Sequence, residues 1–271
     1  MTILITGGTG RIGPRLLPRI LDSGDDCRAL VRSGKTVPTG VTAVEGDLLD
    51  PESLPQAVKG VSAVVHLAAV LRAENDEDVH RVNVDGTRNL VNAVREHAPD
   101  ARFIMAGTTR VYDADLPRPA REDDPVGAQD AYPASKIIAE RVLRESGLTW
   151  SVLRFALVYG DGDGHLQAAP RVLASWKWHP AQAMSLLHHR DIATGVRLAL
   201  TGALDGHIVN LVDDAPASAY EISRLVGADF PESAEPLTNP WSGRADGSLA
   251  RQLGFVPVVR SMYQAAAEGA L

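Results

Sequence analysis

The first thirteen residues constrain the fold more than any other part of the chain. A β-branched run at 2–6 leads directly into Thr6-Gly7-Gly8-Thr9-Gly10-Arg11-Ile12-Gly13, and a helical pattern follows at 11–22. Glycines in the spacing Gly7-x-x-Gly10-x-x-Gly13 allow a tight turn and a close backbone approach to a pyrophosphate. The start of the helix offers free N–H groups to the same anion. This context predicts a dinucleotide-binding loop with contacts from Gly7, Thr9, Gly10, Arg11, Ile12 and Gly13.

Short strand-like runs alternate with helical patterns over the first 155 residues. Several of the runs are apolar on both faces, as expected for strands that helices cover on each side. The alternation predicts an α/β fold, a Rossmann-type doubly wound parallel sheet. The predicted strands are 2–6, 27–31, 41–45, 63–66, 102–106 and 150–154, and the predicted helices lie near 11–22, 51–58, 78–97 and 132–145.

The pattern becomes less regular after Arg154. A glycine-rich loop at 160–164 is followed by helices expected near 166–176, 191–200, 218–226 and 246–253, and by a strand at 207–211 that can rejoin the sheet. We therefore predict two units. Residues 1–155 plus about 186–212 form the dinucleotide-binding domain, and about 156–185 plus 213–271 form a small C-terminal substrate-binding lobe.

Composition excludes several classes of function. The chain has 271 residues, 45% of them apolar, which is enough for a domain with a substantial core. A net charge of −7 without a Lys/Arg block argues against nucleic acid or an anionic membrane as a partner. The apolar run 61–71 is too short to span a bilayer. Cys27 is the only cysteine, which favours a reducing, cytoplasmic compartment.

The end of the second predicted strand bears on the choice of dinucleotide. Enzymes that use NAD place an acidic residue there, on the ribose 2′-hydroxyl. Here the sequence is Ala29-Leu30-Val31-Arg32-Ser33, without a carboxylate. Arg32 can pair with a 2′-phosphate, and Arg11 can approach it from the glycine loop. The sequence therefore favours NADP over NAD, although both arginines can equally be solvated surface residues.

Tyr132-Pro133-Ala134-Ser135-Lys136 opens a predicted helix and supplies a candidate catalytic pair. Positions i and i+4 share a helix face, so Tyr132 and Lys136 can point into one cleft. The ammonium is expected to stabilise the phenolate, which lets the tyrosine exchange a proton with a substrate oxygen. Thr108, at the carboxyl end of a strand, can donate a hydrogen bond to the developing oxyanion, and Thr109 competes for that role.

These motifs, in this order, resemble the extended short-chain dehydrogenase/reductase family, in its NAD-dependent epimerase/dehydratase-like branch, over nearly the whole chain. The resemblance implies that Asp47 contacts the adenine and that Lys136 holds the nicotinamide ribose. It identifies Thr108 and Tyr132 with the family's catalytic hydroxyl and proton donor. The segment 153–160 resembles the one against the nicotinamide, with Phe155 where a proline is usual. The further cofactor contacts that it implies are Leu48, Leu67, Ala68, Ala69 and Asn83.

Three departures from the family pattern narrow the reaction. Dehydratases of the family carry Asp-Glu after the catalytic threonine, where this chain has Thr109 and Arg110. Leu157 replaces an asparagine that holds sugar-nucleotide phosphates, and leucine cannot donate that hydrogen bond. The lobe is also short. An apolar or small substrate is therefore favoured over a nucleotide sugar.

The sequence thus predicts NADPH-dependent reduction of a ketone or aldehyde, or the reverse alcohol oxidation. The substrate partner is then a small carbonyl compound or alcohol. Two alternatives stay open: a sugar epimerase with tightly bound NAD, and a regulatory protein that senses dinucleotide without chemistry. The helices near 78–97 and 132–145 can pair in a homodimer, or their apolar positions can simply face the sheet.

Two further clusters have competing interpretations. His188-His189-Arg190-Asp191 suggests a metal site, but adjacent side chains rarely point to one ion, so no metal is expected. Residues 176–179, Trp-Lys-Trp-His, lie in the predicted lobe. They can line a substrate pocket or pack against the sheet domain.

Overall fold

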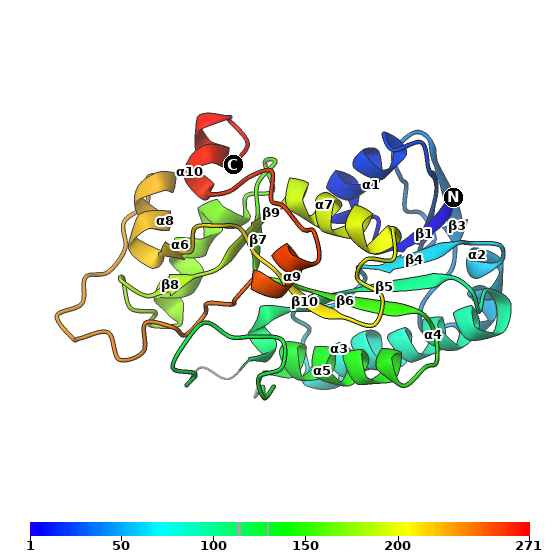
Figure 1. Cartoon of the computed structure of the whole chain (residues 1–271), viewed down its shortest axis with the longest axis horizontal. Coiled ribbons are helices and arrows are strands. Elements are labelled where there is room, and N and C mark those ends of the chain that lie inside the picture. The colour runs from blue at the N-terminus through cyan, green and yellow to red at the C-terminus, as the bar shows by residue number, and fades with distance from the viewer. Residues whose placement is uncertain (113–114, 129) are drawn as a thin grey trace.

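A seven-stranded parallel sheet forms the centre of the molecule in this computed structural model, which describes residues 1–112, 115–128 and 130–271. The strand order is β10-β6-β5-β4-β1-β2-β3 (Figure 1). This confirms the predicted doubly wound fold, including the late strand, which pairs with β6. The strands are β1 (Thr2–Thr6), β2 (Asp26–Val31), β3 (Val41–Glu45), β4 (Ala63–His66), β5 (Arg102–Thr108), β6 (Trp150–Phe155) and β10 (Ile208–Leu211).

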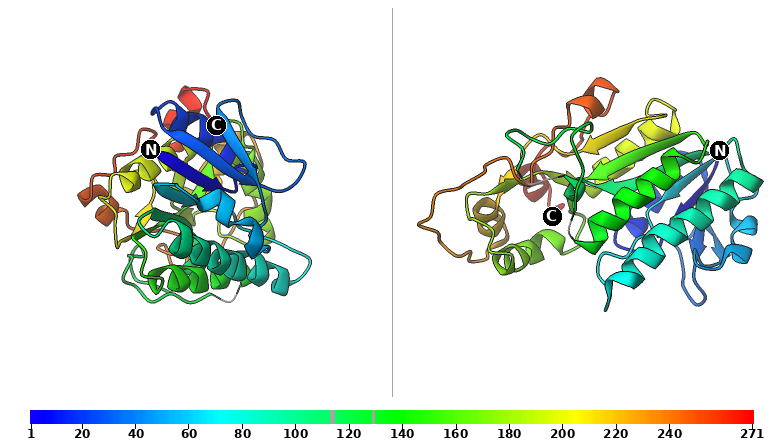
Figure 2. Two further views of the ribbon diagram at one scale, coloured as in Figure 1. Left: turned by 90° about the vertical axis from the view of Figure 1, so that its right-hand side faces the viewer. Right: turned by 90° about the horizontal axis from the view of Figure 1, so that it is seen from below.

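Helices cover both faces of the sheet because side chains along each strand alternate between the two faces. Along β1, Ile3 and Ile5 pack with α1 and α7, while Leu4 belongs to the cluster on the opposite face. Figure 2 shows the helices of that second face from below. The covering helices are α1 (Gly13–Leu21) and α7 (His189–Leu200) on one side, and α2 (Pro55–Val58), α4 (Gly86–His97) and α5 (Ala131–Arg144) on the other.

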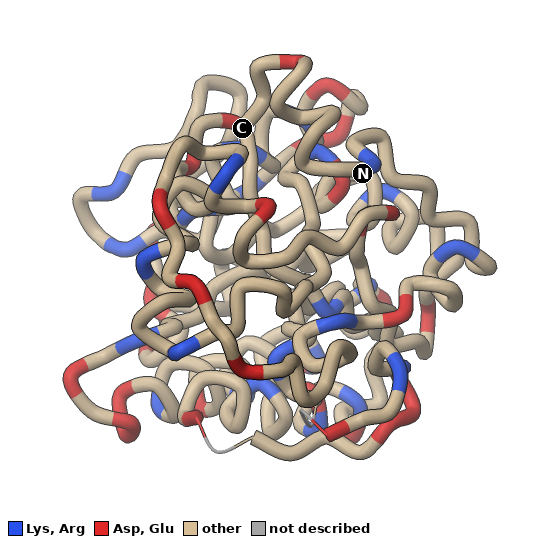
Figure 3. Tube along the Cα trace, turned by 90° about the vertical axis from the view of Figure 1, so that its left-hand side faces the viewer, with Lys and Arg blue, Asp and Glu red and all other residues tan. Residues whose placement is uncertain are grey.

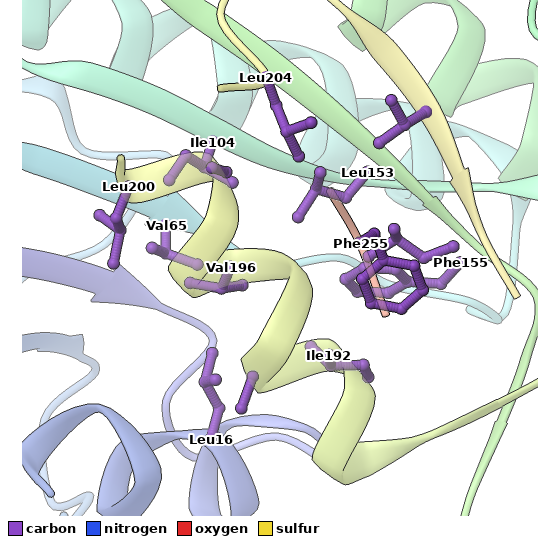
Figure 4. Packing of buried hydrophobic residues seen from close by; sticks show 14 of the residues in the cluster. Leu16, Val65, Ile104, Leu153, Phe155, Ile192, Val196, Leu200, Leu204 and Phe255 are labelled. Atoms are coloured by element: carbon purple, nitrogen blue, oxygen red, sulfur yellow. The ribbon is translucent and has the colours of Figure 1, made fainter. Parts of the chain in front are cut away.

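Helix α7 shows how the core forms. Ile192, Val196 and Leu200 are buried on the helix face that meets the sheet, at the i, i+4, i+8 spacing of an amphipathic helix (Figure 4). Phe155, at the end of β6, and Phe255, from the C-terminal part of the chain, belong to the same cluster. This core therefore joins the sheet to a segment that lies about a hundred residues further along the sequence.

The helix predicted near 78–97 is interrupted by one π-helical turn. α3 (Asp76–His80) runs into the π-helical turn Arg81–Asp85, and α4 continues from Gly86. Such turns insert one extra residue per turn and often occur at functional sites. Asn83, a predicted cofactor contact, lies in this turn and is buried.

The remaining elements gather at one end of the sheet, beyond the carboxyl ends of β5, β6 and β10 (Figure 1). β7 (Leu157–Tyr159) pairs in parallel with β9 (Leu186–His188), and β8 (Ala183–Met184) pairs antiparallel with β11 (Ala217–Ser218). A separate apolar cluster is built mainly from α6 (His165–Ser175), α8 (Ala219–Val226) and α10 (Met262–Ala267). These short strands and α10 were not predicted.

Part of the predicted lobe packs against the sheet instead. Ala250, in α9 (Ser248–Gln252), and Phe255 belong to the cluster formed with α1 and α7. The division into two domains stays a prediction. Across the part of the chain that the structure describes, every helix is too short or too polar to reach across a bilayer. Figure 3 shows acidic and basic residues interspersed over the face at the lobe end.

Candidate active site

The glycine loop closes tightly against the end of β4. Gly7 has φ +74°, and a Cβ atom placed there would lie 2.7 Å from the backbone nitrogen of Ala68. A Cβ on Gly13 would lie 2.4 Å from the carbonyl carbon of Gly8. No side chain caps the first turn of α1, whose N-cap residue is Ile12. These features fit a dinucleotide, because the backbone is left open to a pyrophosphate at a helix N-terminus.

A pocket of about 680 Å³ lies where β2 and β3 end. Arg32 and Asp47, two predicted cofactor contacts, both line it. Lys35, which the sequence analysis passed over, adds a second cation; only its proximity to Arg32 in the sequence pointed to it. The other lining residues are Ser33, Glu45, Gly46, Asp50, Ser53 and Gln56.

Arg11 does not line this pocket. Its Nη1 donates to the backbone oxygen of Asp163 at 3.3 Å and lies 3.7 Å from the Asp163 carboxylate. The structure therefore directs Arg11 towards the 160–164 loop. Thr9 is exposed beside it, while Leu48 is buried.

Buried neutral groups tie the end of β4 to the glycine loop. His66 is 1% exposed and lies between two hydroxyls, with Nδ1 2.7 Å from Thr6 Oγ1 and Nε2 3.0 Å from Thr87 Oγ1. Burial, followed by the charge of Lys136, lowers the pKa of His66 to about 3. The imidazole is therefore neutral and structural. It positions the backbone at Leu67, Ala68 and Ala69, which the sequence placed beside the cofactor.

Asn83 connects the same backbone to the catalytic helix. Its Oδ1 accepts from the Val70 backbone nitrogen at 2.7 Å, and its Nδ2 donates to Val70 O and to Ser135 Oγ, both at 2.9 Å. Ser135 lies between Tyr132 and Lys136 in sequence. Asn83 therefore holds α5 in register with the β4 end. Its predicted contact with the cofactor stays a prediction.

Thr108 and Tyr132 meet at the carboxyl end of β5. Tyr132 and Thr108 share a side-chain hydrogen bond, so Thr108 rather than Thr109 is the hydroxyl that meets the phenol. Burial raises the pKa of Tyr132, which the Arg110 guanidinium and the Thr108 hydrogen bond oppose. Arg110 lies over the ring and is therefore a cation that acts on the phenol. The predicted action of Lys136 on Tyr132 stays a prediction.

Lys136 is 2% exposed, one helical turn after Tyr132. Burial lowers its pKa to about 8, although the Glu140 carboxylate one turn further raises it. The amine is therefore poised to exchange its proton in a mildly alkaline range, which suits a group that replenishes a proton donor.

A buried ion pair lies under this site. Arg154 meets Glu140 through two hydrogen bonds, Nη2 to Oε2 at 2.7 Å and Nε to Oε1 at 3.2 Å, and both side chains are almost fully buried. Arg154 also donates to the Tyr112 hydroxyl at 2.8 Å, and that hydroxyl donates to Asn210 Oδ1 at 2.7 Å. The network links α5, β6 and β10, and sequence reasoning missed it because its members lie far apart in the chain.

The remaining candidate residues from the sequence are Phe155, the cluster 188–191 and the segment 176–179. Phe155 is 5% exposed within the core, and its predicted contact with the cofactor stays a prediction. His189 Nε2 lies 2.9 Å from Asp163 Oδ2. Among the described residues, no group of three His, Cys, Asp or Glu side chains is placed to hold a metal ion. Trp178 bonds to the Gln182 backbone, while Trp176 lies against Arg110.

Comparison with known proteins agrees with this geometry. The family model described as NAD dependent epimerase/dehydratase family matches residues 3–211. A 3-diazoavenalumate denitrifying reductase from Streptomyces sp. is 30% identical over 267 residues, which cover 89% of this chain and 86% of that relative. A 2-alkyl-3-oxoalkanoate reductase from Stenotrophomonas maltophilia is 37% identical over 177 residues, 61% of this chain. The chain spans about half of that second relative, 53%.

Solved structures share the fold over the full length. A short-chain dehydrogenase/reductase superfamily protein from Agrobacterium tumefaciens, crystallised with NAD, superposes with a TM-score of 0.81 at 24% identity, covering 99% of this chain and 95% of that one. The wider set of relatives comprises reductases, dehydrogenases and epimerases. The chain belongs to the NAD-dependent epimerase/dehydratase family.

Proposed function

We propose that this protein is an NADPH-dependent reductase of a ketone or aldehyde, which also runs in the reverse direction as an alcohol dehydrogenase. The observation that carries this proposal is the meeting of Thr108 and Tyr132 at the carboxyl end of β5, with the buried Lys136 one helical turn after Tyr132. Two relatives named as reductases support it. The replacement of the dehydratase Asp-Glu pair by Thr109 and Arg110 argues against water elimination.

Each residue has one task in the reaction. Bound NADPH supplies the hydride that adds to the carbonyl carbon. The Tyr132 hydroxyl donates its proton to the carbonyl oxygen, so that the product is an alcohol. Thr108 donates a hydrogen bond to that oxygen as negative charge develops on it. Lys136 returns a proton towards Tyr132, which is consistent with an ammonium pKa of about 8.

Replacing Tyr132 tests the proposal. Purified protein is assayed for NADPH oxidation with a panel of aldehydes and ketones, and Tyr132→Phe removes only the proton donor. We expect kcat to fall by about 10²–10⁴-fold, while NADPH binding by fluorescence titration is unchanged. Full turnover in Tyr132→Phe, or no NADPH oxidation with any carbonyl of the panel, overturns the proposal.

The NADP preference rests on the pocket at the end of β2. Arg32 and Lys35 line it together with Ser33, and a guanidinium pairs well with a phosphate. In the Arg32→Gln variant, we expect the Kd for NADPH to rise about 10-fold, equivalent to about 1.4 kcal/mol. The Kd for NADH, titrated in parallel, should stay within about 2-fold. Tighter NADH binding by the unaltered protein contradicts this part of the proposal.

A further inference from the structure

Arg110 occupies a place in the active site that the proposed reaction does not use. It follows Thr108 by two residues, in the short 3₁₀ turn Thr109–Val111 that ends β5. The backbone nitrogen of Arg110 donates to Thr108 Oγ1 at 3.2 Å. The position of the arginine is therefore tied to the catalytic hydroxyl itself.

The guanidinium lies close to two aromatic rings. Its central carbon is 5.8 Å from the centre of the Tyr132 ring and 5.5 Å from the centre of the Trp176 ring. Tyr132 comes from the catalytic helix α5, and Trp176 from the end of α6 in the lobe. Cation–π contacts with both rings help to hold the guanidinium where α5 meets the lobe.

The positive charge of Arg110 is only weakly compensated. Within the described part of the chain, its one ion-pair partner is Asp130, which accepts from Nη2 at 2.7 Å. The Asp130 side chain is 72% exposed, and such surface pairs contribute little free energy. Since a guanidinium has five N–H donors, Asp130 leaves donors free for a second acceptor. The nearby Glu140 carboxylate is already engaged by Arg154.

We propose that Arg110 binds a carboxylate of the substrate, so that the preferred substrates are short oxo acids whose carbonyl faces Tyr132. The proposal rests on the proposed reduction. A guanidinium is the side chain best suited to a carboxylate, which it can bind through two parallel hydrogen bonds. Because the cation lies against the ring of the proton donor, a carboxylate held there keeps the carbonyl a few bonds away, within reach of the Tyr132 hydroxyl.

Matched acids and esters test the proposal. The probes are pyruvate, 3-oxobutanoate and 4-oxopentanoate, each paired with its methyl ester, which removes the charge. For the unaltered enzyme with NADPH, we expect kcat/KM for at least one acid to exceed that of its ester by 10-fold or more. In Arg110→Met the preference should vanish, through a loss for the acid that matches the original preference, 10-fold or more, and a loss of less than 3-fold for the ester.

Two further variants separate binding from structure. Arg110→Lys keeps the positive charge but loses the planar group that binds a carboxylate through two parallel hydrogen bonds. It should therefore retain part of the acid preference that Arg110→Met loses. Arg88→Met, an exposed arginine paired with Asp85 on α4, is the matched control and should leave both substrates unaffected. An equal loss for acid and ester in Arg110→Met overturns the proposal, since it indicates only a structural role for Arg110. A preference that survives Arg110→Met overturns it as well.

Binding provides a readout that is independent of turnover. Calorimetric titration of the enzyme–NADP⁺ complex, which cannot reduce an oxo acid, with the three acids should show binding that weakens at least 10-fold in Arg110→Met. Undetectable binding of all three acids, or binding unchanged in the variant, overturns the anion site. Turnover of neutral carbonyls without any acid preference overturns this inference alone, while the proposed reductase function stands.

Discussion

Buried polar side chains differ between the two ends of the site. Among the described residues before Lys136, the buried polar side chains are uncharged. Hydrogen bonds link most of them around the end of β4: Thr6, His66, Asn83, Thr87 and Ser135. From Lys136 onward the buried set includes charged or ionisable groups: Lys136, Glu140, Arg154, Asp191 and Asp213. The dinucleotide side is thus held by shape and neutral hydrogen bonds, and the substrate side depends on charge.

This difference has a physical reason. A backbone that cradles a pyrophosphate needs close approach and free N–H groups, which small and neutral residues provide. A site that moves protons and binds a substrate of defined charge needs ionisable groups, whose burial has to be offset by partners. Substitutions that add atoms should therefore impair the dinucleotide side most. Substitutions that change charge should impair the substrate side most.

The largest effect is expected at the buried ion pair. Glu140→Gln leaves the Arg154 guanidinium without a counter-charge, so we expect the free energy of unfolding to fall by about 3–5 kcal/mol. Urea unfolding followed by circular dichroism measures this change. The double variant Glu140→Leu/Arg154→Met should recover much of the loss, because no unpaired charge stays buried. If Glu140→Gln is as stable as the unaltered protein, the ion pair does not stabilise the substrate side of the site.

The next effect tests the dinucleotide side. In Gly7→Ala the new methyl group meets the backbone of Leu67 and Ala68 at under 3 Å, at a residue with φ +74°. We expect the Kd for NADPH to rise about 100-fold, equivalent to about 2.7 kcal/mol, as measured by fluorescence titration. Gly127→Ala is the control, since an added Cβ there meets nothing within 4 Å. Normal NADPH binding by Gly7→Ala would show that the close approach is unimportant.

The smallest effect concerns Asp213, which is 4% exposed. Its Oδ1 accepts from the Ala215 backbone at 3.1 Å, while Oδ2 has no partner among the described residues. Burial, reinforced by Asp191 and Asp214, raises its pKa to about 8, against about 3.9 in an unfolded chain. Between these values the folded protein binds more protons, so its stability should fall as the pH rises from about 4 to 8.

Asp213→Asn removes this dependence and keeps the Oδ1 acceptor. By differential scanning fluorimetry, we expect the variant to melt about 2–4 °C above the unaltered protein at pH 8, with a smaller gain at pH 5. Asp85→Asn, at a half-exposed carboxylate paired with Arg88 on α4, should show no such gain. Parallel pH profiles for Asp213→Asn and the unaltered protein would contradict a protonated carboxyl at this position.

The sequence predicted the dinucleotide side better than the substrate side. The glycine loop, the alternation of strands and helices and the Tyr132–Lys136 spacing are local signals, and the structure follows them. The strand predicted at 207–211 was expected to join the sheet, because an apolar run of this kind is buried most readily at a sheet edge that helices cover. In the structure it pairs with β6. The sequence left Thr108 and Thr109 as candidates for the hydroxyl beside Tyr132, and in the structure Thr108 is the one that meets the phenol; its catalytic role stays a prediction.

The residues that were missed depend on contacts between distant segments. Arg110 contacts Trp176 at the end of α6, and Arg154 contacts Glu140 and Tyr112. The hydrophobic periodicity of the sequence contains no information about such contacts, since each of these residues alone is compatible with an ordinary loop, strand or helix. Arg11 was expected near a 2′-phosphate but contacts Asp163, whose loop reaches α1 only in the folded chain.

The contact between Trp176 and Arg110 gives the protein an intrinsic optical reporter. The indole is 50% exposed and lies against a cation whose surroundings change when an anion arrives. Its emission intensity and wavelength should respond to occupancy of that position without any added label. A Trp176→Phe variant would identify this signal among those of the other three tryptophans, so that chemical libraries can be screened for ligands before any turnover is known.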